Sequence, residues 1–191
     1  MKDLIEIRWH GRGGQGVKTA SLLFAEAMVA QGKHVQAFPE YGPERMGAPV
    51  QAFNRFSEKK VTIHCSVESP NIVVLLDPTL IGKVDITAGL GPEGKLIVNT
   101  HISAEELRKK LELKTGKLYT VDASRISRET IGRDIPNTPM IGALVKVSGL
   151  LSLEDLLIDT ENKLKKKFRN KPEIISGNLE AIKKAYAEVR G

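Results

Sequence analysis

The sequence predicts an α/β domain with a helical C-terminal region. Three observations support this prediction: short apolar runs typical of buried strands, helical periodicity between them, and a last third without a convincing strand. The 191 residues are near the usual size of one domain, and no repeat, low-complexity linker or change in composition divides them. We therefore expect a single domain over residues 1–191.

The first forty residues form a β–loop–α–β unit. Leu4–His10 has the composition of a strand and leads into four glycines. Val17–Gln31 follows with helical periodicity, and Lys33–Phe38 is a second strand closed by Pro39. The unit has about the length that a parallel crossover needs. The helix residues expected on or near its buried face are Leu22, Leu23, Ala27 and Val29.

The middle of the chain alternates strands with loops. Tyr41–Pro49, with the sequence YGPERMGAP, is irregular by composition. Val50–Phe56 and Val61–Cys65 are predicted strands joined by SEKK in a hairpin. Three further strands are expected at Asn71–Asp77, Gly94–Asn99 and Leu118–Val121. The first of these contains five consecutive apolar residues, which indicates a strand buried on both faces.

Helices dominate the rest of the chain. Ser103 and Glu106 form a capping box for a helix that ends near Leu113, and Ser152 is a further N-cap. Short helices are expected at Ser124–Ile131 and Pro139–Leu150. Two apolar stripes then follow at helical spacing: Leu153, Leu156, Leu157, Leu164 and Phe168, and Ile175, Leu179, Ile182, Tyr186 and Val189. We expect two C-terminal helices that pack on the sheet or on each other, rather than a coiled coil with a partner.

The composition excludes several classes of site. The single cysteine, Cys65, excludes an internal disulfide and any iron–sulfur cluster held by this chain alone, because such clusters need about four thiolates. Cys65 is expected to pack in its strand rather than to attack a substrate. The four histidines lack metal-ligand spacing: His10, His34, His64 and His101. No metal site and no catalytic residue is predicted.

The expected location is the cytoplasm. No apolar run approaches the ~20 residues of a membrane span, and the first ten residues, MKDLIEIRWH, carry acids where a signal peptide needs an apolar core. The net charge of +6 includes six cations within one nonapeptide, Lys163–Lys171. A lysine-rich helix end favoured by the helix dipole is the first interpretation. A patch for nucleic acid or for an anionic partner or ligand is the alternative, and the aromatic content of 5% argues against nucleic acid.

The glycines fit the fingerprint of a phosphate-binding loop. Gly11-x-Gly13-x-x-Gly16 stands between a strand and a helix, where free amides and the helix dipole favour an anion. The acid that would bind a ribose should end the second strand, and only Glu40, after a proline, is available there. Arg12 and Lys18 add charge that an NAD site does not need. An empty turn, an NAD-type nucleotide and another anion all remain open.

Almost the whole chain resembles one family. HGRGGQG and AFPEYGPERMGAPVQAF, at His10–Gly16 and Ala37–Phe53, resemble the gamma subunits of 2-oxoacid:ferredoxin oxidoreductases, with pyruvate and 2-oxoisovalerate gamma chains as the nearest pattern. The likeness continues, in the same order, through VVLLDPTLI, VDITAGL, IVNT, IPNTPMIGALVKVSGLLSLEDL and SGNLEAIKKAY. The resemblance implies a Rossmann-like mixed sheet with flanking helices and a helical C-terminal region.

The resemblance also implies a component of an enzyme rather than a complete one. Family members of this type assemble alpha, beta, gamma and delta chains into a heterotetramer of anaerobic metabolism. This complex is a pyruvate synthase of the EC 1.2.7.1 type, which converts pyruvate, coenzyme A (CoA) and oxidised ferredoxin to acetyl-CoA, CO₂ and reduced ferredoxin. Thiamine diphosphate, Mg²⁺ and [4Fe–4S] clusters are expected in the partner chains. A stand-alone NAD(P)-binding oxidoreductase is the alternative.

Two sets of residues are the predicted sites in such an assembly. The glycine loop would bind CoA phosphates or support the neighbouring Tyr41–Pro49 loop against the alpha chain. Its members are Gly11, Arg12, Gly13, Gly14, Gln15, Gly16 and Lys18. The predicted subunit interface consists of Tyr41, Glu44, Arg45 and Gly47. Neither nucleic acid nor a membrane is an expected partner.

Overall fold

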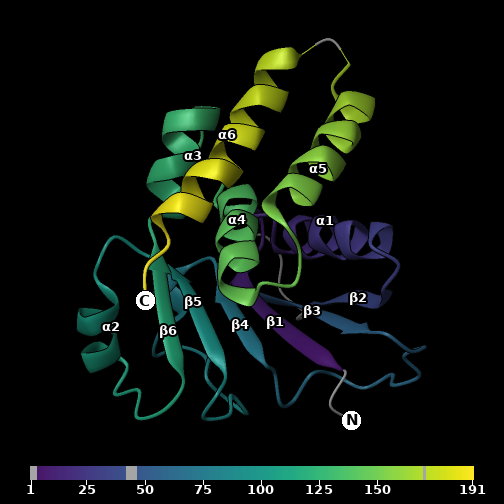
Figure 1. The fold of residues 1–191 in the computed structure, drawn as a ribbon. Coiled ribbons are helices and arrows are strands. Elements are labelled where there is room, and N and C mark those ends of the chain that lie inside the picture. Colours follow the sequence, from purple (N-terminus) through teal and green to yellow (C-terminus); the bar gives the residue numbers. More distant parts are fainter. Residues whose placement is uncertain (1–3, 42–46, 170) are drawn as a thin grey trace.

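A mixed sheet forms the centre of the computed structural model, which describes residues 4–41, 47–169 and 171–191, apart from the side chain of Tyr41 (Figure 1). The strand order is β2-β3-β1-β4-β5-β6. Adjacent strands are parallel from β1 to β6, whereas β3 is antiparallel to both β1 and β2. The strands are β1 Ile5–Arg12, β2 His34–Tyr41, β3 Pro49–Ser57, β4 Ile72–Leu75, β5 Lys95–Asn99 and β6 Lys117–Val121. The predicted α/β class and mixed sheet are confirmed.

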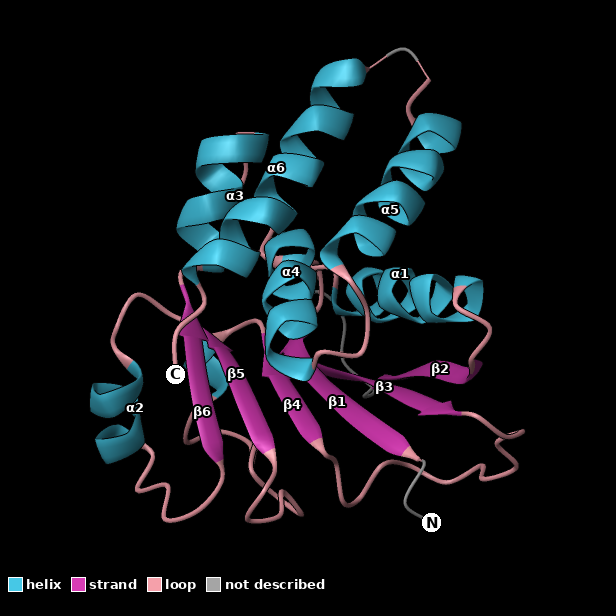
Figure 2. Ribbon diagram, viewed as in Figure 1, coloured by secondary structure: helices cyan, strands magenta, loops and turns pink. Residues whose placement is uncertain are grey.

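Helices cover both faces of the sheet unequally. Figure 2 shows most of them on one side, where α1, α3, α4 and α6 pack over the strands and α5 packs on α1 and α6. Their bounds are α1 Val17–Ala30, α3 Ala123–Ile131, α4 Asn137–Ser148, α5 Leu153–Lys167 and α6 Pro172–Glu188. The opposite face carries α2 Ala104–Lys110 and the short 3₁₀ helix η1 Pro78–Leu80, with Leu80 and Leu107 buried against β4, β5 and β6.

Trp9, the only tryptophan of the chain, belongs to the larger core. Its side chain is fully buried on β1, and its indole Nε1 donates a 2.7 Å hydrogen bond to Oδ1 of Asn54 on β3. Asn54 in turn donates to the carbonyl of Ser21 in α1. Sheet and helix layer are thus joined by a chain of hydrogen bonds inside the core.

Strand β3 accounts for two differences from the sequence predictions. The predicted strand Val61–Cys65 is absent, because β1 and β2 already occupy both hydrogen-bonding edges of β3. Cys65 is therefore exposed rather than packed in a strand. The second difference is that β2 continues through Pro39 to Tyr41. Proline has no N–H to donate. It is tolerated here because β2 is an edge strand, so one of its sides has no neighbouring strand that would need this donor.

The helix predictions are largely confirmed. Ser103 accepts a hydrogen bond from the Glu106 amide at 3.2 Å, and Ser152 accepts one from the Asp155 amide at 3.0 Å, so both residues cap their helices. Val29 is wrong as a buried residue: 57% of it is exposed. The buried stripe of α1 runs through Phe24 instead, with Val17, Ala20, Ala27 and Met28. No helix in the described ranges combines the length and apolar character of a membrane span.

Gly142 brings α4 and α6 into close contact. A Cβ atom at this position would lie 2.3 Å from the Ile182 carbonyl oxygen, which belongs to the helix backbone and cannot rotate away. We expect Gly142→Ala to push the helices apart and lower the free energy of unfolding by about 1–3 kcal/mol, a cost typical of overpacking. Urea denaturation measures this change. Gly91→Ala is the matched control, because nothing lies within 4 Å of a Cβ there; equal stability of both variants would contradict the argument.

Candidate functional site

The glycine loop connects β1 to α1 at the carboxyl edge of the parallel strands. Gly11 and Arg12 belong to β1 itself and pair with Val50 and Pro49 of β3. The Gly13 amide donates to the Ala48 carbonyl at 2.9 Å. The Gly47 amide donates to the Gly13 carbonyl at 3.1 Å, which ties the loop to the residues that precede β3. Loop and predicted interface therefore adjoin one another.

Arg12 is bonded on three sides within the protein. Its Nε lies 3.2 Å from Oδ2 of Asp77, its Nη2 donates to the Thr79 hydroxyl at 3.0 Å, and its Nη1 donates to the Gly47 carbonyl at 2.9 Å. Gln15 joins the same network, because its Nε2 donates to Asp77 Oδ2 at 2.7 Å and its Oε1 accepts from the Arg12 amide at 2.8 Å. The charged guanidinium of Arg12 is thus already engaged in interactions within this chain.

Asp77 is the centre of this network, and sequence reasoning missed it. It follows β4, caps η1 by accepting from the Thr79 amide at 2.8 Å, and is 7% exposed. Burial alone would raise the pKa of its carboxyl. The hydrogen bonds from Thr79 and Gln15, together with the charge of Arg12, outweigh burial and hold that pKa below its usual value. The available signal was an aspartate directly after a buried strand and before a proline.

Packing favours glycine at two positions of the loop, and at Gly16 the backbone conformation favours it as well. A Cβ on Gly11 would lie 2.5 Å from Cγ2 of Val17. Gly16, the N-cap of α1, has φ 80°, and a Cβ there would lie 2.5 Å from Nδ2 of Asn137 at the start of α4. Asn137 is a second residue that sequence reasoning missed. The fingerprint spacing is therefore compatible with a tight strand–helix turn that needs no ligand.

The loop retains some capacity for an anion. No side chain caps the amides at the N-terminus of α1, and the first turn of this helix contains no acid. Lys18 is exposed in this turn. The helix dipole contributes only about 0.3–1 kcal/mol, so several amides would have to act together.

The sheet topology argues against a dinucleotide site. β3 separates β1 from β2, so Glu40 lies two strands away from the glycine loop, exposed on the edge strand. In dinucleotide-binding folds the ribose-binding acid follows the strand next to the glycine loop. Glu40 is therefore wrong as a ribose-binding candidate for this loop.

Arg8 and His10 flank Trp9 along β1, so their side chains lie on the opposite face of the sheet from Trp9, where they form a buried polar pair. Arg8 Nε donates to His10 Nε2 at 3.0 Å, and Arg8 Nη2 donates to the Ala88 carbonyl at 2.5 Å. Burial, and then the charge of Arg8, lower the pKa of His10 to about 4, against a smaller opposing effect of Asp85. His10 is thus a neutral acceptor at neutral pH. Across the described residues, no group of three or more His, Cys, Asp or Glu side chains could hold a metal ion.

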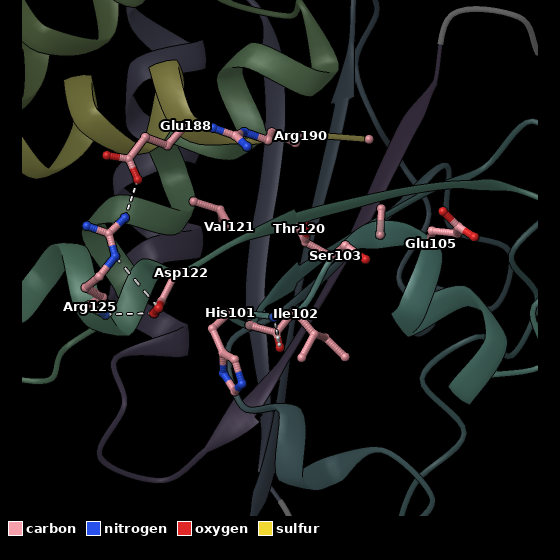
Figure 3. Close-up of a pocket in the computed structure, with 13 residues that line it drawn as sticks. His101, Ile102, Ser103, Glu105, Thr120, Val121, Asp122, Arg125, Glu188 and Arg190 are labelled. Carbon is pink, nitrogen blue, oxygen red and sulfur yellow. Dashed lines mark hydrogen bonds and ion pairs between the residues drawn. The ribbon is translucent and has the colours of Figure 1, made fainter.

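A cavity of about 610 Å³ opens farther along the carboxyl edge, beside the ends of β5 and β6 (Figure 3). The backbone of Arg190 exchanges hydrogen bonds of 2.7 and 3.0 Å with Thr120, so the C-terminus forms one wall. Three charged side chains of the cavity pair with each other: Arg125 contacts Glu188 and lies 3.8 Å from Asp122. This cavity presents no reactive arrangement.

The predicted interface is only partly described. Tyr41 ends β2, and Gly47 is an exposed glycine with φ 88° in the turn before β3. Glu44 and Arg45 lie outside the described residues.

Comparisons with known proteins agree over nearly the whole chain. The family model for pyruvate ferredoxin/flavodoxin oxidoreductase matches residues 6–188. Pyruvate synthase subunit PorC of Thermotoga maritima is 47% identical over 189 residues, covering 99% of this chain and 96% of its own. The pyruvate/ketoisovalerate oxidoreductases common subunit gamma of Pyrococcus furiosus is 46% identical, covering 96% of each chain. The crystal structure of the Thermotoga maritima subunit superposes with a TM-score of 0.84 at 45% identity, over 98% of both chains.

The pKa of His10 predicts an acid-sensitive stability. The unfolded chain binds a proton at the ordinary pKa of 6.5, whereas the folded chain resists protonation down to about 4. The free energy of unfolding should therefore fall as the pH drops from about 6.5 to about 4, with a contribution of roughly 3 kcal/mol from His10. Urea denaturation across this range measures the loss.

His10→Gln isolates this contribution, because glutamine keeps an acceptor for Arg8 and has no proton to gain. The variant should lose less stability than the wild type over the same pH range, and His34→Gln, at an exposed histidine, should behave like the wild type. Identical pH profiles for His10→Gln and the wild type would show that the buried histidine is not responsible.

Proposed function

The chain belongs to the gamma subunits of the pyruvate ferredoxin/flavodoxin oxidoreductase family and is a subunit of pyruvate synthase (EC 1.2.7.1), and we propose that it supplies a supporting surface rather than a reactive group. The observation that carries this proposal is that the polar side chains of the glycine loop bond to other residues of the same chain. Arg12 and Gln15, the polar side chains nearest the glycines, are bonded to Asp77, Thr79 and the Gly47 carbonyl.

The cofactor chemistry is assigned to partner chains. A [4Fe–4S] cluster needs about four thiolates, and Cys65 is the only cysteine. The residues of this chain therefore do not fit a cluster. We assign thiamine diphosphate, Mg²⁺ and the clusters to the alpha, beta and delta subunits of a cytoplasmic heterotetramer. No catalytic residue is proposed in this chain, and we treat residues 1–191 as one domain.

The supporting role follows from what the glycine loop holds in place. Arg12 connects the end of β1 to η1 and to Gly47, and the backbone of Gly13 holds Gly47 and Ala48. These two residues end the loop between β2 and β3. We propose that this loop docks against the alpha subunit, with Tyr41, Glu44, Arg45 and Gly47 in the contact.

Binding of CoA phosphates is the second candidate for the same loop. It is favoured by the N-terminus of α1, where Gly16 provides no side-chain cap and Lys18 lies in the first turn. CoA supplies acidic phosphate groups that the amides of Gly14, Gly16 and Val17 and the side chain of Lys18 would bind, since the Gly13 and Gln15 amides already donate to the Ala48 and Arg12 carbonyls. Arg12 would contribute little charge to such a site, since Asp77 already neutralises it.

Pyruvate is the proposed 2-oxoacid, because relatives along the whole chain are named as pyruvate synthase subunits. A stand-alone NAD(P)-binding oxidoreductase is less well supported, since β3 separates the glycine loop from β2. An anaerobic pull-down of the tagged chain from its own cells tests the assignment. We expect a thiamine-binding chain, a cysteine-rich ferredoxin-like chain and CoA-dependent pyruvate oxidation. Recovery of the chain alone, with bound NAD(P), would contradict it.

Arg12→Gln distinguishes the two candidate roles of the loop. If the loop supports a subunit contact, the substitution should weaken assembly about tenfold, equivalent to about 1.4 kcal/mol, because Gly47 and the end of the docking loop lose the hydrogen bond that holds them in place. The KM for CoA should stay unchanged in the complex that remains. Size-exclusion chromatography at several protein concentrations measures assembly, and steady-state kinetics measures the KM.

Asp77→Asn provides the matched test. It disrupts the same network at Asp77, whose carboxylate would repel a phosphate and therefore cannot be part of a CoA site. Under the supporting role it should reproduce the assembly defect of Arg12→Gln. A raised KM for CoA in Lys18→Gln, with normal assembly in all three variants, would instead favour the CoA site.

A further inference from the structure

The end of the α5–α6 hairpin projects beyond the rest of the molecule. Figure 1 shows the C-terminus of α5 and the start of α6 at the far end from the sheet, past α3 and α1. α6 packs on α3 from its second turn onward, where Gly177 lies against the Thr130 carbonyl. The described residues at this end include four exposed cations, here named the basic tip: Lys166, Lys167, Arg169 and Lys171.

The basic tip differs from the neighbouring lysines in its pairing. Lys163 is ion-paired with Glu26 of α1 and with Asp159, and Lys165 is paired with Glu161 at 2.7 Å. No ion pair to any described residue is formed by the members of the basic tip. Lys167 lies over the Phe168 ring, 5.4 Å from its centroid.

The fold does not require this charge. The C-terminus of a helix carries the equivalent of about half an elementary charge, which one cation in the last turn neutralises. Glu173 is the one acid between Lys166 and Gly177, so residues 166–177, which contain the basic tip, have a net charge of +3. That is half of the +6 of the whole chain, at the end of the molecule that lies far from the sheet (Figure 1).

We propose that the basic tip is a docking surface for a small acidic electron-carrier protein, which the complex reduces. This inference rests on the proposed function as a pyruvate synthase subunit, since the family description names ferredoxin or flavodoxin as the carrier. Opposite charges on the two proteins steer the encounter and accelerate association.

A transient partner fits this surface better than a permanent subunit. Lysine is depleted in stable interfaces because its ammonium group must be desolvated there, whereas weak redox encounters use small and solvated contacts. Three of the four members of the tip are lysines, and all four are exposed. Nucleic acid fits less well, because base stacking needs aromatic platforms and Phe168, already covered by Lys167, is the one aromatic residue at this end.

Replacement of all four members by glutamine tests the proposal in the assembled complex. The matched control replaces four exposed lysines that form no ion pair with a described residue: Lys59, Lys60, Lys114 and Lys183. Both variants remove the same charge. Pyruvate-dependent reduction of an acidic ferredoxin from the same cells is measured against ferredoxin concentration at several ionic strengths, with methyl viologen as an acceptor that needs no docking surface.

The tip variant should raise the KM for ferredoxin about tenfold at low salt and flatten its dependence on ionic strength. The control variant should keep the wild-type KM, and both variants should reduce methyl viologen at the wild-type rate. An unchanged ferredoxin KM in the tip variant would overturn the proposal. Loss of assembly in the tip variant would also overturn it, by making the tip a subunit contact, while leaving the subunit assignment intact. Failure of the wild-type chain to associate with any partner would instead refute the subunit assignment.

Discussion

The Asp77 carboxylate is the interaction on which the carboxyl edge of the sheet depends. It accepts hydrogen bonds from Gln15 and Thr79 and neutralises Arg12, so the turn after β1 and the turn after β4 are held together by one buried acid. Arg12 extends this link to Gly47. Because β1 and β4 are neighbours, the two turns are adjacent by topology, and the carboxylate converts that adjacency into a fixed geometry. The glycine spacing is one half of this arrangement, and the VVLLDP sequence is the other half.

The position of β3 decides how the glycine loop can be used. In a dinucleotide-binding unit the strand after the first helix returns next to the first strand. Here an antiparallel strand enters between them, which moves Glu40 to the edge of the sheet and brings Ala48 to the glycine loop. The same local motif, strand, glycines and helix, therefore leads to a contact between loops instead of a ribose site. The identity of the family agrees with this geometry, since its gamma subunits act inside an assembly.

Local signals predicted most of the elements, and long-range contacts explain the failures. The caps at Ser103 and Ser152 and the apolar runs of β4 and β5 depend on neighbouring residues, so the sequence alone was sufficient. Residues 61–65 have the composition of a strand, but a hairpin with β3 would require a free hydrogen-bonding edge on β3. Both edges are taken by β1 and β2, and no local sequence pattern reveals this. Asp77 and Asn137 were missed for a related reason. Their partners are 62 and 121 positions away in Gln15 and Gly16, and only the folded chain brings them together.

Trp9 gives this subunit a built-in optical probe. As the only indole of the chain, fully buried and hydrogen-bonded to Asn54, it should emit at short wavelength in the folded state and shift to the red when the sheet opens to water. It reports on the junction of sheet and helix layer, not on the projecting end of the α5–α6 hairpin. The fluorescence of the isolated chain can therefore establish that a surface variant is folded before any partner is added. Tryptophan fluorescence can thus distinguish a functional defect from a folding defect.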